Sequence, residues 1–455
     1  MIDYGRRRRK KELAQKGKEA AMALHELLQA PCHFSSAIAK VDPFNAFPIQ
    51  MEPYMHDLLT FCRFNILMRT LFVPNGVSSD ITAGYRILYS VEKYTNYNPL
   101  TSHWIPFAFQ SAAMMHAILG CADTATTAPW NHRLRPTAIK HLNAAIHIVN
   151  KSLAADPPTI TDSIIAVVST IAVMEEVSGH HDNWKVHMKG LYQLVKIRGG
   201  LVALKSNPLL LDKIHRADLA GAVDALETPY FAANWDSSCL LTTPAIPFRN
   251  GRFTELERTL PFDDRIRSLI TAFEATIESL NQLHAGDTEV DPTNLRANLT
   301  SMQYTLLSMG FDDRPNEFCR LSLILFLASI FNELPQGHVL GNDKLRMKAR
   351  SLLDDTSSLM RANESNLDIL VDFRLWIMFL AASTIFNHTS PLKEWYLKSI
   401  AVTASTAGIL DCSWDDMRNR VSTFLYITSV HSFAFEDVWQ AAQRGSSIWF
   451  PRHVC

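Results

Sequence analysis

The sequence predicts an all-α protein with one large multi-helix domain, and three observations support this fold class. Apolar side chains recur at helical spacing along most of the 455 residues. Short clusters of Asp, Asn, Ser, Gly and Pro interrupt these windows, and such side chains compete with the helix backbone. In addition, no segment alternates apolar and polar residues as a half-buried strand would. A hydrophobic share of 47% and a charged share of 20% are typical of a folded protein with a substantial core.

Residues 1–40 are expected to form a basic, flexible N-terminal segment. Residues 1–18 carry a net charge of +6, whereas the rest of the chain sums to −7. The basic residues concentrate in one run, which consists of Arg6, Arg7, Arg8, Arg9, Lys10 and Lys11. Such a run suits nuclear import, because the acidic grooves of import receptors bind extended Lys/Arg chains. The alternative is a solvated tail without a partner.

Residues 41–455 are expected to form the helical domain. A proline-punctuated connection at 31–50 leads into a first helix over 52–72, with Pro53 in the first turn, where a missing amide hydrogen loses no bond. Further helices are expected over 105–122, 134–153, 160–178, 183–198, 209–226, 262–284, 292–309, 316–333, 343–361, 366–386, 390–408, 413–428 and 435–444.

The long segment 227–252 interrupts this helical pattern. It carries Trp235, three prolines and two phenylalanines, which is too aromatic for a disordered linker. We expect it to lie folded over the surface and to divide an N-terminal helical half from a C-terminal one. A lid over a ligand pocket is the functional alternative.

The clearest single helix lies at 184–201. Trp184, Met188, Leu191 and Val195 fall on one face, and lysines fall on the opposite face. Two glycines at 199–200 then end the helix, because glycine reaches the left-handed conformation of a C-terminal cap without a Cβ clash.

This stretch resembles the middle of the fungal-specific transcription factor domain. The signature positions, which we expect to be structural, are Trp184, His187, Gly190, Leu191, Arg198, Gly199 and Gly200. The stretches at 42–50, 51–64 and 213–222 resemble the same family. The resemblance implies a helical regulatory domain that usually follows a six-cysteine zinc binuclear cluster, and it implies no catalytic motif. Some family members that lack the cluster begin with a short basic region similar to residues 3–12, so the chain is expected to start within that region or after a missing upstream exon.

Cysteine spacing argues against a zinc cluster in this sequence. The seven cysteines are never closer than 30 residues apart, whereas structural zinc sites take thiolates in close pairs. Direct sequence-specific DNA binding is therefore not transferred from the family. The scattered cysteines are typical of buried, reduced thiols in a nuclear or cytosolic protein.

The candidate catalytic and metal-binding residues are a group of histidines and four aspartate pairs. His180 and His181 precede the 183–198 helix and lie seven and six residues from His187, whereas a helical zinc site normally uses i and i+4. Aspartate pairs at 263–264, 312–313, 354–355 and 415–416 raise a terpene cyclase as a remote alternative, but the second magnesium-binding motif is missing. Nucleophile elbows, phosphate loops and dinucleotide turns are also missing. The sequence therefore predicts no enzyme, no metal site and no cofactor.

These observations lead to one functional prediction. We expect a regulator that is nuclear or shuttles between nucleus and cytoplasm. It would contact the transcription machinery or other regulators, form a homo- or heterodimer, or sense a small molecule. The alternative is a helical interaction protein without a transcriptional role. No membrane span is expected, since the most apolar run, at 321–331, is shorter than the roughly 20 residues that a bilayer requires.

Overall fold

The computed structural model describes residues 47–59, 100–126, 135–156, 158–234, 251–285, 292–331, 344–362, 367–385 and 390–449. Throughout these ranges the regular elements are helices and no strand occurs, which confirms the all-α fold class. The basic run at 6–11, the rest of the segment 1–40 and most of the insert 227–252 lie outside the described residues.

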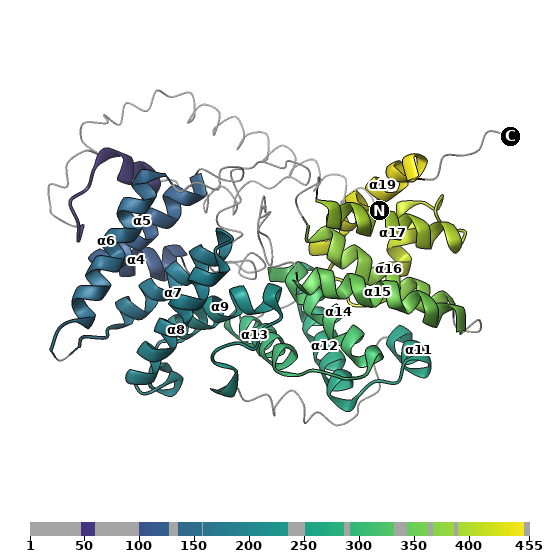
Figure 1. Cartoon of the computed structure of the whole chain (residues 1–455), viewed down its shortest axis with the longest axis horizontal. Helices are drawn as coiled ribbons and strands as arrows, with labels where there is room; N and C mark the ends of the chain where they lie inside the picture. The colour runs from purple at the N-terminus through teal and green to yellow at the C-terminus, as the bar shows by residue number, and fades with distance from the viewer. Residues whose placement is uncertain are drawn as a thin grey trace, which may run out of the picture.

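The helices that come first in the chain form an N-terminal group, drawn in blue to teal in Figure 1. Their bounds are η3 Leu100–Trp104, α4 Ile105–Ala108, α5 Ala112–Thr126, α6 Pro136–Leu153, α7 Asp162–Val177, α8 His181–Ile197, η4 Leu201–Leu204 and α9 Pro208–Ala225. A helical turn at 53–59 precedes them. α5 packs against α6 and α7, and α7 packs against α8 and α9.

One helix expected from the sequence, 105–122, is interrupted at Phe109–Ser111. The physical reason is that Ser111 caps the N-terminus of α5. The Ser111 hydroxyl accepts a hydrogen bond from the Met114 amide at 3.2 Å and also bonds Ser163 on α7, so the chain starts a new helix there. In the described part of the chain, no single helix is long and apolar enough to cross a membrane, although the pair bent by 120° at this break passes that test by length and composition.

The helices that follow form a C-terminal group, drawn in green to yellow (Figure 1). Their bounds are α11 Gly251–Thr259, α12 Asp264–Ala285, α13 Pro292–Ser308, α14 Arg314–Phe331, α15 Lys344–Ala362, α16 Leu367–Ser383, α17 Pro391–Thr406, α18 Trp414–Val421 and α19 Thr428–Trp449. α14 and α16 are the central helices, because α16 packs against α11, α14, α15, α17, α18 and α19. Every residue of α14 from Asn316 to Ile330 is buried, which confirms the expected core helix at 321–331.

The end of the chain departs from the helix boundaries expected from periodicity. α18 ends at Val421, and α19 starts at Thr428, seven residues earlier than expected. The connection at 422–427 is held by tertiary contacts. The buried Trp376 indole donates to the Leu425 carbonyl at 2.9 Å, and the Ile427 amide donates to His431 Nδ1 at 2.9 Å.

α9 joins the two groups. It packs on α7 and α8 on one side and on α13 and α15 on the other. The buried apolar residues of both groups belong to one continuous core cluster.

Candidate functional site

The signature helix α8 is locked to α9 by one tryptophan. Trp184 is 1% exposed, and its indole nitrogen donates to the Ala217 carbonyl at 2.7 Å. A Cβ at Gly221 would lie 2.5 Å from the Trp184 ring, so only glycine lets α9 approach this closely. Leu191, on the same face of α8, is also fully buried. The structure thus places Trp184 at the α8–α9 contact and Leu191 in the core.

The end of the signature holds the turn after α8. Gly199 and Gly200 have φ values of 97° and 79°, in the region that favours glycine, and the Gly200 amide donates to the Val195 carbonyl at 2.9 Å. The Arg198 guanidinium bonds the Ile160 carbonyl at 2.6 Å and the Asp162 carboxylate at 2.9 Å. Arg198 therefore ties the end of α8 to the start of α7.

The remaining signature positions lie away from the α9 contact. His187 is half-buried, with Nε2 3.9 Å from the Glu175 carboxylate, and burial lowers its pKa against the opposing effect of that carboxylate. Gly190 is exposed, and a Cβ there would meet nothing within 4 Å.

The two histidines at the start of α8 each meet a carboxylate: His180 precedes the helix, and His181 is its first residue, two residues earlier than the start expected from the sequence. His180 Nδ1 lies 3.1 Å from Glu175, and His181 Nδ1 lies 2.9 Å from Glu176. The His181 ring also stacks on Trp184, with ring centroids 4.9 Å apart. Across the described ranges, no three His, Cys, Asp or Glu side chains converge as a metal site would require.

The aspartate pairs lie at helix starts and in helices rather than together. Asp313 accepts from the Asn316 amide at 2.9 Å at the start of α14, and Asp263 pairs with Arg265 before α12. Asp416 donates its amide to Ser413 at the start of α18. Asp354 lies in α15, where it comes within 3.9 Å of Arg350. These contacts are those of helix caps and helix surface pairs.

A buried carboxylate on α9 is the first functional candidate that sequence reasoning missed. Asp218 is fully buried and accepts three hydrogen bonds, from the Tyr230 amide at 2.8 Å, the Phe231 amide at 2.9 Å and the Tyr304 hydroxyl at 2.8 Å. Burial raises the pKa of Asp218 to about 6, although the three donors oppose the shift. Asp218 therefore connects α9 both to α13 and to the segment that follows α9.

A second carboxylate, Glu227, lies just after the C-terminal end of α9 and contacts both helical groups. Glu227 binds Lys185 of α8 at 2.7 Å and lies 3.9 Å from Lys344 of α15. Burial raises the pKa of Glu227, but its bond to Lys185 and the nearby positive charges outweigh this, so the net shift is downward. The start of the expected insert is thus held between the two helical groups.

Two further ionisable residues lie on α9, namely Lys213 and His215. Burial lowers the pKa of Lys213 to about 8 and that of His215 to about 4. Sequence patterns do not single them out, because an ordinary amphipathic helix also mixes charged and apolar residues. The available signal is that apolar residues occur on all sides of 209–226, which is typical of a helix buried between two layers.

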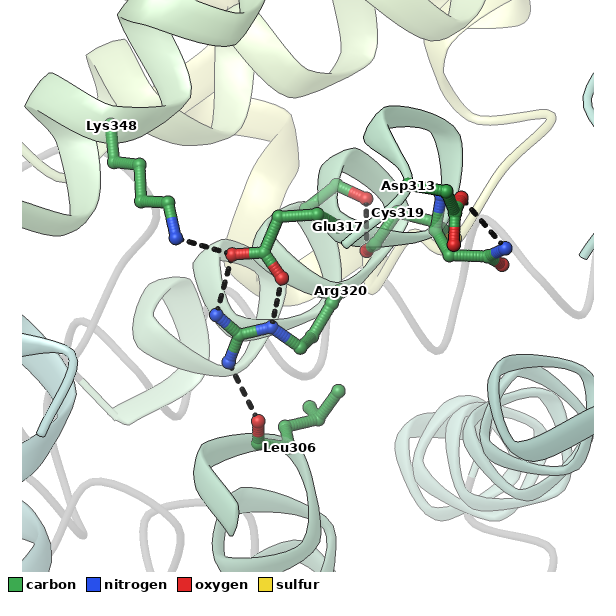
Figure 2. Close-up of polar contacts among 8 residues, drawn as sticks. Leu306, Asp313, Glu317, Cys319, Arg320 and Lys348 are labelled. Carbon is green, nitrogen blue, oxygen red and sulfur yellow. Dashed lines mark hydrogen bonds and ion pairs between the residues drawn. The ribbon is translucent and has the colours of Figure 1, made fainter. Parts of the chain in front are cut away.

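The C-terminal group has its own ion network, shown in Figure 2, in which Glu317 and Arg320 are buried and Lys348 is exposed. Glu317 accepts two hydrogen bonds from the Arg320 guanidinium, at 2.7 and 2.8 Å, and one from Lys348 at 2.5 Å. Arg320 also donates to the Leu306 carbonyl at 2.8 Å. All the polar atoms in the network point at one another and join α13, α14 and α15, so its role is structural (Figure 2).

The geometry therefore favours α9 as the candidate site. α9 carries charged and titrating side chains at the contact between the two groups, where bound molecules can bias how the groups pack. α9 thus offers charged groups and hydrogen-bond donors on a helix that packs against both groups.

The comparisons with known proteins agree with the sequence resemblance. Residues 84–223 match the family model described as the fungal specific transcription factor domain, a range that runs from before η3 to Val223 near the end of α9. No curated protein and no solved structure matches the chain. Residues 84–223 thus match the fungal specific transcription factor domain, the family that the Trp184–Gly200 stretch resembles.

Proposed function

We propose that this protein is a nuclear regulator of transcription that acts through protein contacts or through a small ligand, without catalysis. The family match over 84–223 is the observation that carries the proposal, since this domain is the regulatory part of transcription factors. The basic run at 6–11 supports import into the nucleus.

In the proposed mechanism, α9 is the element through which a signal passes. A ligand or partner that prefers one arrangement of the helices around α9 shifts the population toward that arrangement. We expect the bonds of Asp218 to α13 and of Glu227 to α8 and α15 to be the contacts that differ between arrangements. We expect the transcription machinery or another regulator to bind one of these arrangements in preference to the other.

We further propose that DNA contact comes from a partner. Residues 19–455 carry a net charge of −7, and an acidic domain gains little binding energy from phosphate contacts. A homo- or heterodimer would bring such a partner to the same promoter.

Chromatin occupancy of a tagged copy, expressed from its own locus, tests the proposal. We expect discrete occupied promoters, and we expect replacement of Arg6–Lys11 by alanine to abolish nuclear accumulation and occupancy together. The matched control replaces three exposed lysines of the body, Lys189, Lys196 and Lys205, with alanine and is expected to leave accumulation intact.

Two results would contradict the proposal. Uniform cytoplasmic signal without promoter occupancy would leave a helical interaction protein that has no transcriptional role. Equal loss of accumulation in the lysine control would show that the basic run at 6–11 carries no specific import function.

A further inference from the structure

Lys213 on α9 has an unusual environment for a lysine. Its side chain is half-buried, and Nζ lies 4.4 Å from the centroid of the Trp104 ring. Within the described part of the chain, no carboxylate, carbonyl or hydroxyl oxygen hydrogen-bonds to this ammonium group. Burial lowers the pKa of Lys213 to about 8, and the charge of Arg216 adds to the shift. A cation–π contact offsets part of the loss of hydration but satisfies none of the three N–H donors.

His103 lies against the same indole ring. Its ring centroid is 4.8 Å from that of Trp104, in an edge-on arrangement, and its other neighbour is Phe107, stacked at 5.8 Å. His103 Nε2 is buried and has no hydrogen-bond partner among the described residues. Burial lowers the pKa of His103, and the positive charge of Lys213 lowers it further. Two polar groups without acceptors thus flank one tryptophan.

Lys213 lies near the positive charge of Arg216 and the carboxylate of Asp212. Its neighbour Asp212 lies 3.9 Å from Arg216 and 3.5 Å from Arg296, so this carboxylate is shared between two arginines. The remaining neighbour is Cys121 of α5, whose thiol is free of disulfide bonds. Because Asp212 is held by these arginines and makes no hydrogen bond to Lys213, the ammonium group is available to an anion.

We propose that Lys213 and His103 bind the oxyanion of a small molecule, a carboxylate or a phosphate group, beside Trp104. The Lys213 ammonium supplies the charge and up to three N–H donors, and the His103 Nε2–H tautomer supplies one more. The apolar rings of Trp104 and Phe107 contact the rest of the molecule. The site lies between η3 and α9, so an occupied site links the start of the matched domain to the helix that joins the two groups.

This proposal deepens the proposed function by naming the chemical class of its effector, and it rests on that function only for its biological role. The proposed site also explains why position 213 is a lysine, since an apolar residue there would pack against Trp104 without leaving a charge unpaired. A half-buried ammonium group without a hydrogen-bond partner lowers stability, and functional sites are where such local conflicts occur.

Thermal unfolding of the purified full chain provides the first test, with succinate and inorganic phosphate as probes and sodium chloride at matched ionic strength as the reference. We expect one of the two probes to raise the unfolding temperature saturably. A response to succinate alone identifies a carboxylate ligand, and a response to phosphate alone identifies a phosphate ester. No saturable response to either probe overturns the proposal.

Substitution of the lysine assigns the response to the site. Lys213→Met is expected to weaken the response at least tenfold and to raise the unfolding temperature of the ligand-free chain. Lys205→Met removes an exposed lysine just before α9 and is expected to keep the full response. Equal responses of the wild type and Lys213→Met overturn the proposal.

Labelling of the wild-type chain keeps the proposal testable even where Lys213→Met fails to fold. An amine-reactive ester at pH 7.5, followed by peptide mass spectrometry, reports the reactivity of each lysine. Bound anion covers Lys213 and favours its unreactive charged form, so its labelling is expected to fall several-fold while that of Lys205 stays constant. Unchanged labelling of Lys213 at high anion concentration contradicts the site. Because these assays measure binding alone, they can fail while promoter occupancy succeeds, or the reverse.

Discussion

The α8–α9 pair and the α14–α16 pair are stabilised in different ways. α8 buries one face and leaves Val186 and Ile197, on the other, 65% and 69% exposed. α14 is buried on every side, and even the charged Glu317 and Arg320 are only 7% and 6% exposed. The first pair depends on contacts that demand particular residues, whereas the second depends on apolar volume and on paired charges.

This difference explains where the family signature lies. Contacts such as Trp184 against Gly221 accept one residue type at each position, so they leave a recognisable pattern. A helix surrounded by apolar neighbours accepts many combinations of Leu, Ile and Phe of similar volume. The family match accordingly covers the N-terminal group and ends at residue 223, before the C-terminal group begins.

The largest expected effect breaks the charged network of α14, which joins that helix to α13 and α15. Glu317→Gln leaves the buried Arg320 without its carboxylate, and loss of one partner of a buried pair costs about 3–5 kcal/mol of unfolding free energy. Urea denaturation measures this loss. The matched control is Glu255→Gln, since Glu255 is 42% exposed in its pair with Arg252 and its loss is expected to cost at most about 0.5 kcal/mol. Similar losses in both variants would contradict the distinction between the two kinds of ion pair.

The second prediction concerns two glycines of the first pair. Gly221→Ala places a Cβ 2.5 Å from a tryptophan ring that is held by its bond to Ala217, and the overpacking is expected to cost about 3 kcal/mol. Gly190→Ala meets nothing within 4 Å and is expected to stabilise the chain by about 0.5–1 kcal/mol, because alanine is the better helix former. Thermal and urea unfolding of both variants measure the two effects. If both variants changed the free energy of unfolding in the same direction, the space around Gly221 would be large enough for a Cβ, which would contradict close packing of α9 on Trp184.

The third prediction uses pH to separate the two groups. His141 and His215 have pKa values of about 4 in the folded chain, so the unfolded chain takes up protons first and stability falls as pH drops from 6.5 towards 4. Asp218, with a folded pKa of about 6, works in the opposite direction because the folded chain binds its proton first. The destabilising effect of the two histidines exceeds the stabilising effect of the aspartate. The free energy of unfolding is therefore expected to fall by about 2 kcal/mol between pH 7 and pH 5.

Hydrogen exchange locates this acid effect. His141 of α6 hydrogen-bonds His116 of α5 and Tyr54, at 2.9 Å in each case, and protonation removes an acceptor from this chain of bonds. We expect amides of α5 and α6 to lose protection at pH 5 before those of α14 and α16. His141→Gln is expected to reduce the pH dependence, whereas simultaneous loss of protection in both groups would contradict a local origin.

Much of the fold could be predicted because helical periodicity is a local property of the chain. The helices expected at 134–153 and 292–309 differ by at most two residues from α6 and α13. The errors occur where tertiary contacts decide the boundary. Ser111, which bonds Ser163 of a distant helix, divides an expected single helix, and Trp376 holds the Leu425 turn that separates α18 from α19.

The candidate site was less predictable than the fold. The sequence marks Trp184, Gly199 and Gly200 through spacing and helix-capping chemistry. It does not mark Asp218 or Lys213, because nothing in their neighbours along the chain distinguishes them from surface charges. Their partners Tyr304 and Trp104 are 86 and 109 residues away in the sequence.

The amino-acid order alone thus decides the all-α class, the positions of most helices and the family of the 84–223 stretch, since each depends on residues close together along the chain. Tertiary structure decides which charges are buried and which side chains they meet. Burial and pairing depend on residues brought together from distant helices, as with Glu317, Arg320 and Lys348 in Figure 2. The same physical reason places the proposed anion site on α9, because Lys213 becomes an unpaired charge only when α9 packs against Trp104.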